Sequence, residues 1–242
     1  MLRLDLRLVA AVGALAIVAL VSAGALFGRV RVLNLGEELT IPSAFSGALL
    51  VIAALAAFLL AGRLPLAAAS RLSLIALGSF FAFMALDEMF YLHERLEVLT
   101  GVDWQILYAP IVLVAGVAWL GVLLRLRSHP RAAGLFLAGA AAWIASQGLE
   151  RAQWDGAVLL HPWITVPEEA LEMTGSALFA LALLMALQSV LAGEARARTA
   201  KTNGHRRPAT GEAVAPSRSP VAQAPAGVAQ DTDGRAEVGA RR

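Results

Sequence analysis

The sequence predicts an all-α protein, a polytopic transmembrane bundle of about six helices. Of its 242 residues, 58% are hydrophobic and 16% are charged, and the mean hydropathy is +0.68. An ordinary soluble domain has roughly 45–50% apolar and about 25% charged residues. The apolar residues occur in blocks of roughly 20, the length of helix that spans about 30 Å of hydrocarbon. Glycine and alanine are abundant in these blocks, as expected where helices pack closely in lipid.

Six blocks pass this length test, and together they define a bundle over residues 1–194. The predicted helices are residues 8–27, 43–62, 72–94, 105–125, 131–153 and 167–192. From residue 195 to 242 the chain consists mainly of Ala, Pro, Gly, Arg, Thr and Gln without periodicity. Such a segment buries too little apolar surface to offset the entropy of ordering, so the sequence predicts a disordered cytoplasmic tail.

The first block also has features of a signal peptide, because Arg3 and Arg7 precede it and Val21-Ser22-Ala23 lies near its end. The apolar core of a signal peptide usually has about 7–15 residues. The apolar run here is longer. We therefore interpret the block as a retained helix, with a cleaved signal peptide as the alternative.

The distribution of Lys and Arg predicts the orientation, because cytoplasmic loops carry an excess of these residues. With the N-terminus inside, the inner face holds ten of them: Arg3, Arg7, Arg63, Arg71, Arg125, Arg127, Arg131, Arg196, Arg198 and Lys201. The outer face holds four: Arg29, Arg31, Arg95 and Arg151. This bias predicts a multi-pass protein of a bacterial cytoplasmic membrane with both termini in the cytoplasm.

The composition excludes several classes of site. There is no cysteine, which excludes disulfides, thiolate zinc sites, iron–sulfur clusters and covalent c-type haem. The net charge is +2, but the basic residues lie in short loops and in the tail rather than on one face. Membrane topology explains them, and we expect no nucleic-acid partner.

Four ionisable residues lie at the end of the third predicted helix, within about two helical turns. Asp87 and Glu94 are seven residues apart and share a face of a straight helix, whereas Glu88 and His93 lie about 140° apart. We therefore expect only a subset of the four to converge on one point. A charge inside hydrocarbon is costly, so each requires a partner, a water-filled cavity or a function.

Polar residues also gather where the fifth helix ends and the sixth begins. Ser146, Gln147 and Glu150 have helical spacing and form a stripe. Thr165 and Glu168 fit a capping box, with Pro167 in the first turn of the helix. Glu169 follows, and Glu172 lies a full turn deeper, where capping does not explain it.

The predicted topology places all of these groups at the same extracytoplasmic end. The loop before the sixth helix adds His161 and Trp163 there, and the start of the fourth helix adds a further polar group: Asp103, Trp104, Gln105 and Tyr108. Aromatic rings settle at membrane interfaces in any case, so we interpret the tryptophans as interface residues. The cytoplasmic halves hold mainly Ala, Leu, Val and Gly.

The order Leu-Asp-Glu-x-x-x-x-His-Glu at 86–94, followed by Glu-Glu-x-Leu-Glu-Met-x-Gly at 168–175, resembles uncharacterised bacterial multi-span membrane proteins. The resemblance covers the third to sixth helices and implies no activity. Ceramidase and progestin-receptor-like membrane hydrolases bind zinc through several histidines. That pattern is not met, because His129 and His205 fall on the face opposite His93 and His161.

Our first hypothesis is a site for a divalent metal such as zinc, manganese or iron. Asp87, His93, Glu150 and Glu172 are the leading ligands, with Glu94, His161 and Glu169 as alternates. Such a site would make the protein a metal-dependent membrane hydrolase of a lipid-linked or periplasmic small molecule, with Glu88 or Glu94 as general base.

Two other interpretations remain open. Intramembrane acids also mark ion paths and proton relays, which indicates an ion- or proton-coupled transporter or a membrane sensor. Against this, polar residues nearly vanish in the cytoplasmic half. The third interpretation is structural: Arg95 and Arg151 would neutralise Glu88 or Glu94 and Glu150. It leaves Asp87 and Glu172 without an evident partner.

Overall fold

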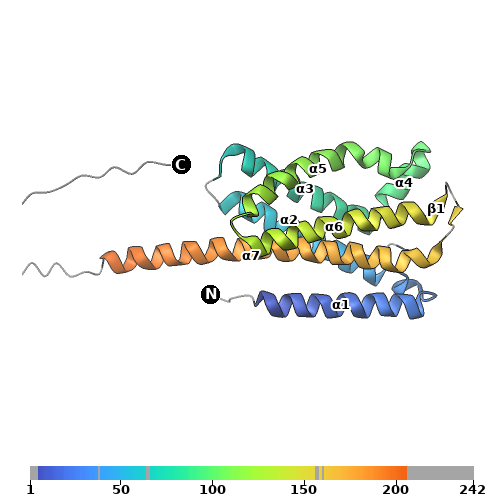
Figure 1. Ribbon diagram of the computed structural model, residues 1–242, viewed down its shortest axis with the longest axis horizontal. Coiled ribbons are helices and arrows are strands. Elements are labelled where there is room, and N and C mark those ends of the chain that lie inside the picture. Colours follow the sequence, from blue (N-terminus) through green and yellow to red (C-terminus); the bar gives the residue numbers. More distant parts are fainter. Residues whose placement is uncertain (1–4, 38, 64–65, 156–157, 160, 206–242) are drawn as a thin grey trace, which may run out of the picture.

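The computed structural model describes residues 5–37, 39–63, 66–155, 158–159 and 161–205, and this part of the chain is almost entirely helical (Figure 1). The all-α prediction is confirmed. The elements in chain order are α1 (Leu6–Phe27), a 3-10 turn η1 (Arg31–Leu33), α2 (Ile41–Arg63), α3 (Ala68–Phe90), α4 (Leu92–Thr100), α5 (Trp104–Leu126), α6 (Pro130–Gln153), β1 (Trp154–Asp155), β2 (Val158–Leu159), η2 (Pro162–Ile164) and α7 (Thr165–His205). The two short strands form an antiparallel pair.

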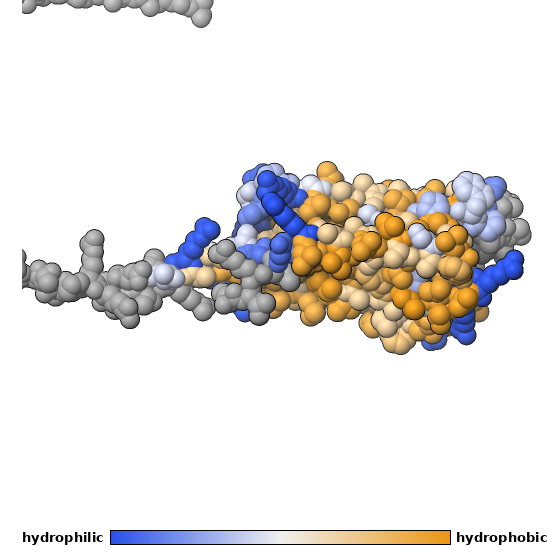
Figure 2. Space-filling model, turned by 90° about the horizontal axis from the view of Figure 1, so that it is seen from below, coloured by the Kyte–Doolittle hydropathy of each residue, from blue (hydrophilic) through white to orange (hydrophobic). Residues whose placement is uncertain are grey.

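Six of the described helices are long and apolar enough to cross a bilayer: α1, α2, α3, α5, α6 and the segment Pro162–Ala197 that contains most of α7. Figure 2 shows an apolar band around the middle of the bundle, with hydrophilic residues toward both ends. Within this band large apolar side chains face outward, and Leu113 is 71% exposed. Such a surface suits lipid rather than water, and the protein is a multi-pass membrane protein.

Helix α7 is the element around which the others pack. It contacts α6, α2 and α1, while α3 packs on α2 and α5 packs on α3. The helix α1 lies at the edge of the bundle (Figure 1), and Gly24 is its one buried residue. An added Cβ at Gly24 would overlap the side chain of Leu35, so the end of α1 lies directly against the segment that follows it.

The apolar core fills the middle of the bundle with rings from three helices. The ring centroid of Phe179 on α7 lies 5.1 Å from that of Phe81 on α3, and 5.3 Å and 5.6 Å from those of Phe136 and Trp143 on α6. Glycine allows α6 and α7 to approach, because an added Cβ at Gly175 would overlap Trp143. Small residues at such contacts are typical of helix packing in membranes.

Apart from shifts of a few residues at the helix ends, the described helices differ from the predicted ranges in two ways. The third predicted helix, 72–94, is broken at Tyr91, which has φ 57° and ψ 39° and separates α3 from α4. The last helix continues to His205, so residues 195–205 of the predicted tail are helical, and residues 206–242 lie outside the described residues. The start of α1 and the end of α7 lie at the same end of the bundle (Figure 1).

The contact between α6 and α7 yields a stability prediction. We expect Gly175→Ala to lower the free energy of unfolding by about 1–3 kcal/mol, because the added methyl group overpacks the contact with Trp143. Gly148→Ala is the matched control, since nothing lies within 4 Å of a Cβ added there. Thermal unfolding in detergent, followed by circular dichroism, measures both. Equal stability of the two variants would contradict this packing.

The predicted orientation is testable by labelling, because the chain has no cysteine. The exposed residues Val98 on α4 and Ser128 after α5 lie at opposite ends of the bundle. We expect an impermeant maleimide to label Val98→Cys in intact spheroplasts. Ser128→Cys should be labelled only after permeabilisation, since the basic loops lie inside. The reverse pattern would show the opposite orientation.

Candidate functional site

A cavity of about 530 Å³ lies at the end of the bundle where α3 and α6 end and α5 and α7 begin. We call it the acidic cavity, because eight carboxylates line it: Glu37, Asp87, Glu88, Glu94, Glu150, Glu168, Glu169 and Glu172. Of the described residues in its lining, His93 is the one histidine, and none is a lysine or arginine. The volume is in the range of small-molecule sites, roughly 300–1,000 Å³.

Asp87 is the most deeply buried of these acids outside α7 and makes three hydrogen bonds. The residue is 3% exposed. Oδ1 accepts the backbone N–H of His93 at 2.8 Å and the hydroxyl of Tyr108 at 2.9 Å, and Oδ2 lies 3.0 Å from Nδ1 of His93. Three hydrogen bonds therefore hold this one carboxylate in place. The prediction that Asp87 lacks a partner is therefore wrong.

These bonds explain why the predicted straight helix breaks. Tyr91 adopts the left-handed conformation, which costs a residue other than glycine about 1–3 kcal/mol. The carboxylate of Asp87 offsets this cost by accepting the N–H of His93 in the first turn of α4, as a capping side chain does. The break brings Asp87, Glu88, His93 and Glu94 into the lining of one cavity, whereas a straight helix would have placed Glu88 and His93 about 140° apart.

Neutral side chains hold the acids of α6 and α7. The indole N–H of Trp104 donates to Oε1 of Glu150 at 3.0 Å, and the amide of Gln105 donates to Oε2 at 3.5 Å. The amide of Gln147 donates to Oε1 of Glu172 at 3.2 Å. Glu172 therefore has a partner, contrary to the prediction. These donors fix the carboxylates in place without cancelling their charge.

The first two turns of α7 contribute three of the eight lining acids. Glu168 is 6% exposed, and Glu169 and Glu172 are partly buried. Thr165, the expected capping partner of Glu168, instead donates to Oε1 of Gln153 at 3.0 Å. Like charges four residues apart, as at Glu168 and Glu172, repel each other, although the helix N-terminus favours negative charge.

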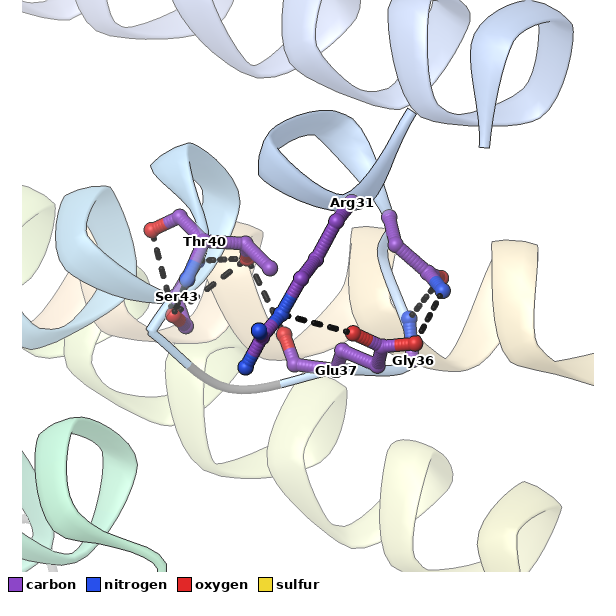
Figure 3. A network of polar contacts seen from close by, with 6 residues as sticks. Arg31, Gly36, Glu37, Thr40 and Ser43 are labelled. Atoms are coloured by element: carbon purple, nitrogen blue, oxygen red, sulfur yellow. Dashed lines mark hydrogen bonds and ion pairs between the residues drawn. The ribbon is translucent and has the colours of Figure 1, made fainter. Parts of the chain in front are cut away.

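Two arginines of this end, Arg31 and Arg151, form ion pairs with acids. Nη1 of Arg151 lies 3.1 Å from Oδ2 of Asp103, so the expectation that Arg151 neutralises Glu150 is wrong. Nε of Arg31 lies 3.6 Å from Oε2 of Glu37 (Figure 3). Arg31 and Arg151 are largely exposed, and neither lines the cavity.

Sequence reasoning missed the part of the lining that follows α1. Asn34, Gly36 and Glu37 belong to it, and the amide of Asn34 donates to Oε1 of Glu37 at 3.0 Å. An added Cβ at Gly36 would lie 3.1 Å from the side chain of Thr165, so this loop lies against the start of α7. The sequence around residues 34–43 indicates only where the next helix, α2, begins.

Two reciprocal hydrogen bonds between Thr40 and Ser43 cap the beginning of α2. The backbone N–H of Thr40 donates to Oγ of Ser43 at 3.0 Å, and the N–H of Ser43 donates to Oγ1 of Thr40 at 3.4 Å (Figure 3). Ser43 also lines the cavity. The capping pair therefore fixes where the loop ends, but nothing in its sequence says that the loop meets α7.

Not every predicted site residue reaches the cavity. His161 is exposed, with its ring centroid 6.1 Å from that of Trp163, and it is not in the lining. The other predicted ligands, Asp87, His93, Glu150, Glu172 and Glu169, are in the lining, as are Glu88 and Glu94. Across the described residues, no group of three or more His, Asp or Glu side chains is positioned to hold a metal ion. The metal site stays a prediction.

Comparison with known proteins identifies one family. Residues 6–187 match the family described as a domain of unknown function (DUF8692). This match covers α1 to the greater part of α7 and includes all of the residues that line the cavity. No curated protein and no solved structure matches the chain.

The network around Asp87 yields a second stability prediction. We expect Tyr108→Phe to lower the free energy of unfolding by about 1.5–3 kcal/mol, because it removes a hydrogen bond to a charged group. The same substitution should cost much less in an Asp87→Ala background, where the acceptor is gone. A double-mutant cycle in detergent measures the coupling. A Tyr108→Phe effect that is independent of Asp87 would contradict the hydrogen bond.

Proposed function

The chain belongs to the DUF8692 family, and we propose that it is a membrane protein that binds a cationic ligand in the acidic cavity. The observation that carries this proposal is the lining, in which eight carboxylates and one histidine meet with no lysine or arginine among the described residues. Charges of one sign that line a cavity with low-dielectric walls focus the electrostatic potential. Such a cavity attracts ligands of the opposite sign.

The hydrogen bonds of the lining support a ligand rather than a purely structural role. Trp104 and Gln147 satisfy acceptor oxygens of Glu150 and Glu172, but their side chains are uncharged. Carboxylates near hydrocarbon cost several kcal/mol when their charge is not compensated. A cation in the cavity compensates several of them at once.

The volume supports a ligand larger than a bare ion. A water molecule occupies about 30 Å³ in the liquid, so a cavity of about 530 Å³ has room for a hydrated ion or a small organic cation. The carboxylates come from four helices and one loop around this space. This dispersed arrangement suits several contacts to one extended or hydrated ligand. The charge bias of the loops favours an opening on the extracytoplasmic side.

Metal-dependent hydrolysis is the second candidate, and the Asp87–His93 pair favours it. Imidazoles that bind metals commonly donate their other N–H to a carboxylate, and Nδ1 of His93 lies 3.0 Å from Oδ2 of Asp87. His93 with Glu150 and Glu172 would offer the mixed nitrogen and oxygen ligands that suit zinc, manganese or iron. At least one of these side chains must turn for the three to converge.

The buried residues that the structure describes give less support to a transport function. The deepest buried polar residue along α7 is Ser176, whose hydroxyl accepts the indole N–H of Trp143 at 3.2 Å. Beyond it the buried core consists of apolar residues such as Phe179 and Leu183. A conduction path requires polar groups across the whole membrane. Binding from one side is therefore the simpler proposal.

Cation binding is testable on the full-length protein in lipid nanodiscs by isothermal titration calorimetry. The probes are the chlorides of magnesium, calcium, manganese and zinc, and putrescine as an organic dication. We expect saturable binding of at least one probe. The double variant Glu150→Gln/Glu172→Gln should weaken it about tenfold or more, because each hydrogen bond to a charged group contributes about 1.5–3 kcal/mol.

Asp103→Asn is the matched control, since Asp103 is an acid at the same end that pairs with Arg151 and does not line the cavity. Its affinity should equal that of the wild type. Absence of saturable binding for every probe would overturn the proposal, and so would an equal loss in the control. Binding of a metal but not putrescine would favour the hydrolase, and the reverse would favour an organic cation.

A further inference from the structure

We infer that α4 (Leu92–Thr100) is an interfacial helix, whose leucine face inserts into the bilayer leaflet at the cavity end of the bundle. The leucine face consists of Leu92, Leu96 and Leu99. Its partner is the lipid surface. The inference goes beyond the proposed function, because this contact lies outside the acidic cavity and does not depend on the ligand.

The sequence of α4 is amphipathic. At 100° per residue, Leu92, Leu96 and Leu99 lie within about 60° of one another on the helix surface. Glu94 and Glu97 lie on the opposite half of the helix. A narrow apolar face with charged residues opposite to it is typical of helices that lie in the plane of a membrane interface.

The described part of the protein does not cover the leucine face. None of the residues of α4 is buried. Leu96 is exposed, and Leu99 is 80% exposed, although the helix contacts α3 and α5. In water these leucines would keep their apolar surface hydrated, at a cost that insertion into a leaflet removes.

The connections of α4 keep it at the membrane surface. Tyr91 alone separates it from α3, and residues 101–103 separate it from α5. Both neighbours are membrane spans, and α4 lies at the end of the bundle where they meet it (Figure 1). Phe90 at the end of α3 and Ile106 in the first turn of α5 are exposed. The leucine face therefore continues the lipid-facing surface of the two spans that α4 joins.

Contacts with Asp87 determine which side of α4 faces the lipid. Asp87 accepts the backbone N–H of His93 at 2.8 Å, and Nδ1 of the ring lies 3.0 Å from Oδ2 of Asp87. His93 and Glu94 are thereby part of the cavity lining. The centre of the leucine face lies about 140° around the helix from these two residues, so it faces away from the cavity.

Contact with the leaflet thus supports one wall of the acidic cavity. The bonds to Asp87 hold the first turn of α4, which carries the lining residues His93 and Glu94. Leu96 and Leu99 lie in the later turns, where none of the residues of α4 is buried by protein. Lipid around these two leucines holds that part of the helix.

Site-directed spin labelling in phosphatidylcholine vesicles tests the inference, because the chain has no cysteine. A nitroxide is attached to Leu96→Cys, to Leu99→Cys and, as the matched control, to Val98→Cys. Val98 is 85% exposed and lies about 130° from the centre of the leucine face. Electron paramagnetic resonance measures the collisions of each label with oxygen, which concentrates in lipid, and with a neutral water-soluble nickel chelate on both sides of the membrane.

We expect the ratio of oxygen to nickel collisions to be several-fold higher at positions 96 and 99 than at position 98. Equal ratios at the three positions would overturn the inference. Low collision rates with both reagents at positions 96 and 99 would also overturn it, because they indicate contact with protein. Spectral broadening that disappears on dilution with unlabelled protein would identify that protein as a second copy of the chain.

The experiment is independent of the proposed function. It contains no cation probe, and the neutral chelate is not attracted by the charge of the acidic cavity. All three replaced side chains are exposed, so the labels leave the core of the bundle intact. Failure of cation binding would therefore leave the membrane contact of α4 standing, and loss of that contact would leave the cation proposal standing.

Discussion

The cost of placing carboxylates beside hydrocarbon governs the end of the bundle that holds the cavity. Asp87 on α3 is bonded to Tyr108 on α5, and Glu150 on α6 is bonded to Trp104 on α5. Glu172 on α7 is bonded in turn to a glutamine of α6. Because each donor lies on another helix, the bonds that satisfy the acids also fix the spacing of α3, α5, α6 and α7. The same constraint therefore shapes both the fold at this end and the cavity within it.

The spans could be predicted from sequence, because length and hydropathy alone determine which segments cross lipid. The break at Tyr91 could not. A tyrosine in the left-handed conformation has no local signature, and it persists here because Asp87 accepts the N–H of His93 across the break. The extension of α7 to His205 was missed for a different reason. A polar segment that continues an existing helix avoids the cost of helix nucleation. The polar composition of residues 195–205 therefore did not predict that they are helical.

The sequence indicated which acids belong to the candidate site better than it indicated what each acid contacts. The acids predicted at the ends of α3 and α6 and at the start of α7 all line the cavity, because helix direction brings those ends together. It did not find Glu37, which reaches the cavity only because its loop packs on α7. It also could not separate Asp87, which holds His93, from the acids that are bonded to neutral amides. That distinction depends on contacts between helices, which spacing within one helix does not contain.

The placement of basic residues supports the proposal that the acidic cavity binds a cation. Gln147 and Arg151 are one turn apart on α6, yet it is the neutral Gln147 that donates to Glu172, and Arg151 pairs outside the cavity with Asp103. An arginine in place of the glutamine would offer a forked, charged donor and offset the repulsion among the acids. A cluster that served stability alone would gain from that exchange. Uncharged donors inside the cavity instead suit the proposed cation site, because they leave the charge of the acids for the ligand.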